Sequence, residues 1–572
     1  MADETPYSFP PAPTPDASEW PGSPIGVSNT ITRTKGRTAV HNKTVDQTPG
    51  LLEKLLKSAH DHLGRISSQQ EIFEHDVAIH GIRVRATTNS RHLFDFWKDN
   101  WFGVDEWAGL VGTPPAEPRI KVYALLGVEG EQEAAYYSHA TDTIVFFNTS
   151  YYGQLKSWVL GAVGRILASE FGIHSIHGAC VEKAGKGVLY IAPTGTGKST
   201  SSYGLMSYPK TRFHSDDWVY VRYTYRTRGG KRVFLLSAAG SDGSKARGYE
   251  VYRWVEAHPG DGRACLTAMT LDNRPLELAL ADLDLSQPIE AYAYTSEKVF
   301  YLRTNLVENY PLAAFEIASS KEENVPDVSG VFMEQKREVI QNVVRDLAEA
   351  VIQRAFSPGA ARNPHSPVFQ NLSTSELKRA MARLIAFDNA RSMLDMSRVL
   401  PPERVYQNPM EPVKLAAVML LRRNKQDPTV LAHLPLESFM ERLLIGETPD
   451  GKRETAYNAY RGVDDQAERA LIGGLEKQAS PTRPLYTLFS AASRPASLDE
   501  EFELFRVMHQ AARCYDLNTT LERDPAVHSK REAVERTMAV IARTLDEEPR
   551  GVALTLEDYG RYAKPYLFGG GC

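Results

Sequence analysis

The chain has 572 residues, of which 42% are hydrophobic and 24% are charged, and its formal net charge is −5. This length exceeds what one hydrophobic core usually organises, so we expect several domains of a globular protein. The charge balance gives no overall reason to expect nucleic acid as a partner. No apolar run approaches the about 20 residues of a membrane helix, and the first residues lack the basic and apolar regions of a signal peptide. We therefore predict a cytoplasmic protein without a membrane partner.

The cysteines support this location. They lie far apart, and none is spaced for a disulfide framework or a zinc site. The chain contains Cys180, Cys265, Cys514 and Cys572. Such sparse and scattered usage fits a reducing compartment.

The first part of the chain predicts a tail followed by a small α/β unit. Residues 1–48 are rich in Pro, Ser, Thr, Asp and Gly, which predicts a disordered tail. Apolar spacing predicts helices over 51–67 and 157–171. Strands are predicted between them at 80–88, 119–128 and 142–149. We expect the small α/β unit to span 51–160.

The rest of the chain is predicted to be sheet-rich first and helical afterwards. Strand-like runs occur at 178–185, 186–192, 216–227, 231–239 and 297–305. Helical spacing follows at 335–356, 375–394, 413–422 and 531–545. The fold class that we expect is multi-domain α/β (α+β), with a nucleotide domain over 161–330 and a mainly α-helical region over 331–572.

A phosphate-binding loop is the clearest motif. Residues 192–200 read APTGTGKST and follow an apolar strand-like run. Gly195 and Gly197 allow a tight turn in which successive N–H groups face phosphate oxygens. Lys198 is expected to reach the outer phosphates and Ser199 to hold Mg²⁺. The nucleotide-binding candidates are Thr194, Gly195, Thr196, Gly197, Lys198, Ser199 and Thr200.

Two adjacent carboxylates lie downstream, in the stretch FHSDDWVYV. Asp216 and Asp217 lie at the start of a strand-like run, 18 and 19 residues after Lys198. Because neighbouring residues on a strand point to opposite faces, the two need not share a role. One could hold the metal while the other accepts a proton from an attacking hydroxyl. Which of them does which is left open.

A histidine upstream completes the constellation. His177 is followed by Gly178, a hairpin-like stretch, the phosphate loop and the Asp pair. This order and spacing, over about 157–225, resembles the HPr kinase/phosphorylase family and the wider superfamily that it shares with phosphoenolpyruvate carboxykinases. The resemblance implies a P-loop kinase core, with His177 beside the γ-phosphate or metal, Asp216 as the base and Asp217 on the metal side. It also points to Arg303, before a Tyr-Pro pair, as a residue that could neutralise phosphoryl charge.

The chain also departs from both families. Bacterial HPr kinases are much shorter, and the carboxykinase pattern requires a metal-binding lysine and substrate-binding arginines in an earlier segment. The arginines available there match no motif; they are Arg83, Arg85, Arg91 and Arg119. The long region after 331 belongs to neither enzyme.

We therefore expect an enzyme, an ATP- and Mg²⁺-dependent kinase. Its acceptor would be a hydroxyl, most simply a serine of a protein, peptide or small molecule. The catalytic candidates are Asp216, Asp217, His177, Lys198 and Arg303. One alternative is a carboxykinase-type enzyme that makes phosphoenolpyruvate, and another is an ATP-binding sensor without transfer activity. The sequence leaves open the acceptor, the choice between ATP and GTP, and the oligomeric state, a homo-oligomer included.

Overall fold

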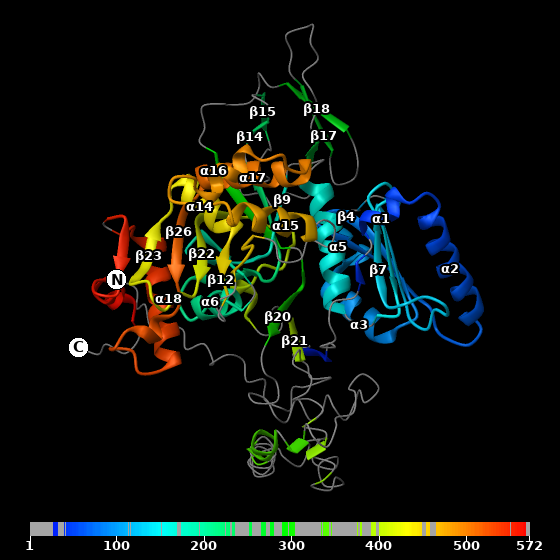
Figure 1. Ribbon diagram of the computed structural model, residues 1–572, viewed down its shortest axis with the longest axis horizontal. Coiled ribbons are helices and arrows are strands. Elements are labelled where there is room, and N and C mark those ends of the chain that lie inside the picture. The colour runs from blue at the N-terminus through cyan, green and yellow to red at the C-terminus, as the bar shows by residue number, and fades with distance from the viewer. Residues whose placement is uncertain are drawn as a thin grey trace.

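The computed structural model describes most of the chain (Figure 1). It covers residues 27–31, 39–40, 42–223 (without 113, 115, 150–151, 169–172 and 194), the strands and adjoining residues between 225 and 303, short segments between 333 and 395, and 400–567 (without 449–452, 458–464 and 550). In this part of the chain, none of the helices combines the length and the apolar character that crossing a membrane requires.

The N-terminal unit is a seven-stranded mixed sheet with helices packed against it, on the right of Figure 1. Its strands lie in the order β2-β7-β8-β6-β4-β3-β5. The elements are β2 (Ala39–Val40), α1 (Asn42–Gln47), α2 (Leu51–Ile66), β3 (Phe73–Ile79), β4 (Ile82–Thr88), α3 (Arg91–Asn100), β5 (Phe102–Gly103), α4 (Val104–Leu110), β6 (Ile120–Leu125), β7 (Ala134–Ser138), β8 (Thr143–Phe147) and α5 (Tyr152–Ile166). The helices and strands predicted over 51–160 are confirmed, because their apolar periodicity matches the face that each buries.

The predicted disordered tail is wrong in three places. β1 (Val27–Ile31) pairs with β21 (Ala390–Asp395), β2 pairs with β7, and α1 packs on β7. A tail that pairs its main chain with distant strands gains hydrogen bonds that composition does not reveal. The rest of 1–48 lies outside the described residues. β21 also replaces the helix predicted at its position.

A ten-stranded sheet forms the centre of the molecule. Its main path is β12-β10-β11-β22-β19-β13-β9, and β26, β23 and β27 continue it from β22. The strands are β9 (His174–Ile176), β10 (Gly178–Lys183), β11 (Lys186–Ile191), β12 (Thr211–Ser215), β13 (Val219–Tyr223), β19 (Ala291–Thr295), β22 (Val413–Arg422), β23 (Thr429–His433), β26 (Arg513–Asn518) and β27 (Ala553–Thr555). β11, β22 and β26 run parallel to one another.

The helix predicted at 413–422 is wrong, because this segment is the central strand β22. A strand buried on both faces reads as one continuous apolar run, which periodicity alone cannot distinguish from a buried helix. The sheet therefore crosses the boundary expected near residue 330. The described residues between 400 and 567 form both strands and helices, whereas a mainly helical region was expected. The helix predicted at 531–545 is confirmed as α18.

Helices cover both faces of the central sheet (Figure 1). Apolar residues of α6 and α18 form one core with the first face, while α14 to α17 form another core with the second face. Their bounds are α6 (Lys198–Leu205), α14 (Leu436–Leu444), α15 (Asp465–Glu476), α16 (Leu485–Ala491), α17 (Ala496–Ala511), α18 (Lys530–Asp546) and α19 (Tyr559–Ala563). Short 3-10 helices lie at Pro402–Arg404, Leu521–Arg523 and Lys564–Tyr566.

Smaller sheets lie outside this centre. The hairpin β24–β25 (Gly446–Glu447 and Arg453–Glu454) follows α14. The other strands are β14 (Tyr225–Arg228), β15 (Lys231–Phe234), β16 (Val251–Arg253), β17 (Cys265–Met269), β18 (Pro275–Ala279) and β20 (Val299–Arg303). The strands predicted within 216–227, 231–239 and 297–305 are thus found as β13 with β14, β15 and β20. Of the helices predicted over 335–356 and 375–394, helical residues are described at 337–342 and 345, and at 375, 378–379 and 382.

We predict that Leu517→Ala lowers the free energy of unfolding by about 2–5 kcal/mol, because Leu517 of β26 is 0% exposed and its truncation leaves a cavity in the central sheet. Denaturant unfolding followed by tryptophan fluorescence measures the loss. Val552→Ala is the control, since Val552 is 73% exposed and its truncation should cost under about 0.5 kcal/mol. Equal stability of both variants would contradict a central sheet that includes β26.

Candidate active site

Two matching interruptions of the central sheet bring His177 and Asp217 together. The chain passes from β9 to β10 at His177, and from β12 to β13 at residues 216–218. β9 pairs with β13 while β10 pairs with β12, so both interruptions fall at the same place in the sheet. There His177 Nε2 lies 3.2 Å from Asp217 Oδ1. The predicted proximity of histidine and carboxylate is therefore present in the structure.

A strained turn directs the Asp217 side chain. Asp217 has a φ of 66°, a conformation that L-residues other than glycine rarely adopt. The Trp218 N–H donates to the carbonyl oxygen of Asp216 at 2.8 Å and closes a three-residue turn around Asp217. The Trp218 ring also packs against the His177 ring, with 5.7 Å between centroids. Such strain is retained where surrounding contacts over-determine it, most often at functional sites.

Lys156 is a site residue that sequence reasoning missed. It lies on α5, the helix between the N-terminal unit and the central sheet in Figure 1, and its side chain is 4% exposed. Its ammonium donates to Asp217 Oδ2 at 2.5 Å and to Glu297 Oε2 at 2.9 Å. The only signal in the sequence was a lysine within the apolar run of a helix, a residue type that is seldom buried unless paired.

Glu297 is the second missed residue. It lies in the loop between β19 and β20, and its side chain is 1% exposed. One of its oxygens binds Lys156, while Oε1 is buried and has no hydrogen-bond partner among the described residues. A single buried ammonium is thus shared by two carboxylates from different segments.

The local charges set the protonation states of this cluster. Burial alone would raise the pKa of Asp217, but Lys156 and His177 outweigh it and hold that pKa well below its usual value. Burial raises the pKa of Glu297 to about 8, against the opposing effect of Lys156. Burial, helped by the charge of Lys198, lowers the pKa of His177 to about 4. At neutral pH, therefore, Asp217 is a carboxylate and His177 a neutral imidazole.

The phosphate loop has the strand–loop–helix context that the sequence predicts. β11 ends at Ile191, and α6 begins at Lys198. Gly195 and Gly197 have φ values of 82° and 105°, which other residues adopt only with strain. The Lys198 ammonium donates to the carbonyl oxygen of Ala192 at 2.7 Å, which holds it over the loop.

The electrostatics connect the phosphate loop with the Asp pair. Burial lowers the pKa of Lys198 to about 8, and the nearby charges of Asp217 and Asp216 act in the opposite direction. Asp216 itself is 4% exposed. Together with the contacts above, this places His177, both aspartates and Lys198 around one region at the end of β11.

Other predicted residues are placed less fully. Arg303 ends β20 opposite Arg391 of β21, and its side chain lies outside the described residues. Thr194 and the side chains of Ser199 and Thr200 also lie outside them, although Ser199 and Thr200 belong to α6. The early arginines each pair with a carboxylate of their own unit: Arg83 and Arg85 with Asp76, Arg91 with Asp95, and Arg119 with Asp142.

The described residues do not form a ready-made metal cage. Over these parts of the chain, no group of three or more His, Cys, Asp or Glu residues is arranged to hold a metal ion. Asp217 is in contact with His177 through one oxygen and with the Lys156 ammonium through the other. The described part of the site is therefore a histidine–carboxylate–lysine cluster.

We predict that Lys156→Met lowers the free energy of unfolding at pH 7 by about 3–5 kcal/mol, because it leaves the Asp217 carboxylate without its ammonium partner beside the buried carboxyl group of Glu297. The depressed pKa of Asp217 stabilises the fold above the unfolded-chain value of about 4. That stabilisation is lost as the pH falls through the folded pKa, so the difference between variant and wild type shrinks below pH 4.

Denaturant unfolding at pH 7 and at lower pH measures this difference. The exposed Lys98 on α3 gives the control Lys98→Met, which should change stability by under about 0.5 kcal/mol. Adding Glu297→Gln to Lys156→Met should change stability little at pH 7, because the raised pKa of Glu297 keeps that group mostly protonated there. Unchanged stability of Lys156→Met would show that the ammonium does not hold the cluster.

Comparisons with known proteins add no assignment. No family model matches this chain, and no curated protein matches it. The chemistry of the site therefore has to be inferred from its own residues.

Proposed function

We propose that this protein is a nucleoside-triphosphate- and Mg²⁺-dependent phosphotransferase with an HPr-kinase-like core. The observation that carries the proposal is the meeting of Asp217 with His177 and Lys156 beside the phosphate loop. A glycine-rich loop between a strand and a helix suits phosphate oxygens. A carboxylate pair beside such a loop suits transfer of a phosphoryl group to a hydroxyl.

The residues of the loop fit a triphosphate. An added Cβ at Gly197 would meet no atom within 4 Å, so the space above this position is open. The N-terminus of α6 adds its partial positive charge. Lys198, which now binds a carbonyl of its own loop, can turn to phosphate oxygens instead.

The residues also fit Mg²⁺ when it is shared with phosphate. In nucleotide sites Mg²⁺ is usually bound by one or two carboxylates together with phosphate oxygens and water, which requires no all-protein cage. Asp217 and Ser199 would hold it, and when bound it supplies positive charge that stabilises the transferred phosphoryl group.

The contacts of Asp217 favour different roles for the two aspartates. Both of its oxygens are engaged, Oδ2 by Lys156 and Oδ1 by His177. A carboxylate held in this way and kept ionised suits an electrostatic role better than proton transfer. Asp216, one residue earlier, is then the candidate that accepts the hydroxyl proton. His177 and Lys156 fix the orientation of Asp217.

Lys156 also favours a second candidate, a carboxykinase-type enzyme. That family requires a lysine upstream of the core, and the structure contains one in contact with Asp217. The matching substrate arginines are not found in the early segment, where each candidate pairs with a local carboxylate. Oxaloacetate-dependent consumption of nucleotide, with release of CO₂, tests this candidate. No consumption with either ATP or GTP would remove it.

We predict that Asp216→Asn lowers the phosphoryl-transfer rate by about 10²–10⁴-fold while nucleotide affinity stays within about threefold, because only the proton acceptor is lost. Asp217→Asn should instead weaken Mg²⁺-dependent nucleotide binding, and Lys198→Ala should abolish it. Purified protein, γ-labelled ATP and cell extract provide the transfer assay, and calorimetry with MgATP provides the affinity.

The outcomes separate the candidate functions. Label on a defined hydroxyl that depends on Asp216 supports the kinase. Nucleotide binding that needs Lys198 but never leads to transfer would support a sensor and contradict the enzyme. If the wild-type protein binds no nucleotide, the whole proposal is wrong.

A further inference from the structure

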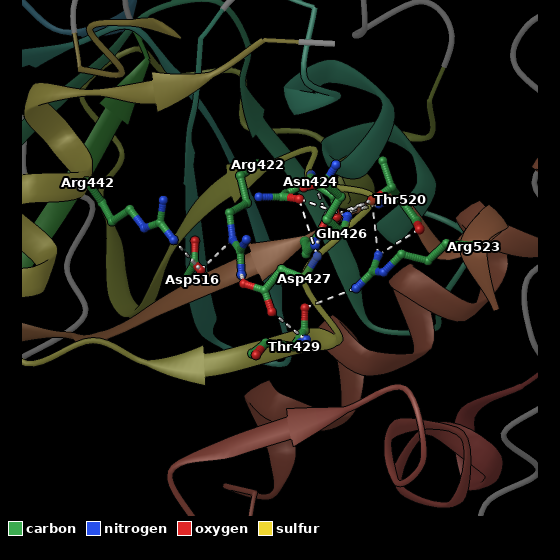
Figure 2. A network of polar contacts seen from close by, with 10 residues as sticks. Arg422, Asn424, Gln426, Asp427, Thr429, Arg442, Asp516, Thr520 and Arg523 are labelled. Carbon is green, nitrogen blue, oxygen red and sulfur yellow. Dashed lines mark hydrogen bonds and ion pairs between the residues drawn. The ribbon is translucent and has the colours of Figure 1, made fainter. Parts of the chain in front are cut away.

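A second group of charged side chains lies on the other flank of the phosphate loop (Figure 2). β11 is flanked by β10, which leads to His177, and by β22, which is followed by β26. The carboxyl ends of β11, β22 and β26 share the sheet edge at which open α/β sheets bind ligands. We call this group the β22–β26 cluster; it consists of Arg422, Asp427, Arg442, Asp516 and Arg523.

Arg422 and Asp516 form the buried base of the cluster. Their side chains are each 5% exposed, and Arg422 Nε donates to Asp516 Oδ2 at 2.6 Å. Arg422 Nη2 donates to Asp427 Oδ2 at 2.6 Å, and Asp427 Oδ1 accepts the Thr429 N–H. These groups are committed to each other and fix the end of β22.

Arg442 is the open member of the cluster. It lies in the last turn of α14, its side chain is 33% exposed, and it approaches Asp516 from the side opposite Arg422 (Figure 2). Its contact with Asp516 Oδ2 is long, at 3.4 Å, and no other polar partner is found for it among the described residues. Most N–H groups of this guanidinium are therefore uncommitted at the rim of the sheet edge.

The cluster carries more positive than negative charge. Figure 2 shows three guanidinium groups, on Arg422, Arg442 and Arg523, and two carboxylates, on Asp427 and Asp516. Arg523 donates to the carbonyl oxygens of Thr520 and Thr429, which carry no charge. Arg523 therefore has no carboxylate partner within the cluster, while Arg442, which is 33% exposed, has only the long contact to Asp516.

Two contacts bring the end of α14 and the end of β26 against the phosphate loop. Two residues after α14 ends, Gly446 packs on Pro193 so closely that an added Cβ would lie 2.6 Å from its Cγ. After β26, Thr519 Oγ1 lies 3.5 Å from the carbonyl oxygen of Thr196. The loop, the end of α14 and the end of β26 are therefore packed against one another.

We propose that Arg442 binds a second anionic group, a phosphate or carboxylate, of a ligand seated on loop 192–197. A guanidinium with free N–H groups matches such oxygens in a planar, two-point contact. Asp516, held by Arg422, acts as a positioning residue that keeps Arg442 at the rim. The anionic group is either a phosphate of the nucleotide nearer its sugar or an acidic group of the acceptor. This inference rests on the proposed function for its setting.

The first test uses inorganic phosphate and does not depend on nucleotide chemistry. In a Lys198→Ala background, where the loop has lost its main cation, phosphate is titrated by calorimetry. Adding Arg442→Lys should weaken the remaining binding by about tenfold or more, because lysine keeps the charge but loses the planar contact. Arg506→Lys is the matched control, since Arg506 on α17 is 41% exposed and has one long ion pair, at 3.8 Å, to Glu503.

The second test identifies the source of the anion. MgATP and magnesium tripolyphosphate are titrated into wild type and Arg442→Lys. Weaker binding of both ligands assigns Arg442 to a phosphate of the nucleotide, because tripolyphosphate has the same chain of phosphates. Weaker binding of MgATP alone would point to a contact with the nucleoside and contradict the inference. If MgATP and tripolyphosphate both bind unchanged while Arg442→Lys weakens phosphate binding in the first test, Arg442 is assigned to an acidic group of the acceptor. Thermal melts of each variant verify that the fold is kept.

The inference is overturned if Lys198→Ala binds no phosphate, or binds it equally well with and without Arg442→Lys. Failure of the wild type to bind MgATP would instead contradict the proposed function, and the phosphate result would still decide the role of Arg442.

Discussion

The buried ammonium of Lys156 joins three segments of the chain at one point. It bridges α5 at the edge of the N-terminal unit, the turn at Asp217 and the loop that carries Glu297. Removing the charges of Lys156 and Asp217 from water is costly, and the cost is offset only while the ammonium keeps its carboxyl partners. The same contacts hold Asp217 in a left-handed conformation that it would otherwise leave. The geometry of the candidate active site therefore depends on a residue of the N-terminal unit.

The sheet edge at the end of β11 has two differently charged flanks. On one flank lie His177 and the aspartates, which under the proposed function would face a cation shared with phosphate. On the other, the β22–β26 cluster has the partly exposed guanidinium of Arg442 at its rim. Groups that are fixed before a substrate arrives stabilise developing charge without reorganising, which is the larger part of catalysis in phosphoryl transfer. The arrangement suits a long, multiply charged ligand that lies across the edge.

Lys156 also changes how the two enzymatic candidates compare. From the sequence, the absence of a recognisable upstream lysine weighed against a carboxykinase. In the structure an upstream lysine contacts the very carboxylate that the resemblance assigns to the metal side. The early arginines do not become better candidates for binding a carboxykinase substrate, because each is paired with a nearby carboxylate. The hydroxyl kinase remains the function that the Asp pair and its surroundings support best.

Much of the local structure and part of the site followed from the sequence by itself. The strand–loop–helix of 186–205 and the amphipathic helices α2 and α18 depend on neighbours within a few residues, whose spacing a sequence displays directly. The position of His177, the phosphate loop and the Asp pair relative to one another was also predictable, since all lie within about forty residues of one another. Tertiary structure alone decided the rest. β22 was mistaken for a helix because burial on both faces removes the alternation that identifies a strand. β1 pairs with β21 although the two strands are far apart in the chain, and such main-chain pairing leaves no mark on composition. Lys156, Glu297 and Arg442 reach their positions only through packing between distant segments, and a side chain's charge has no partner until the fold supplies one.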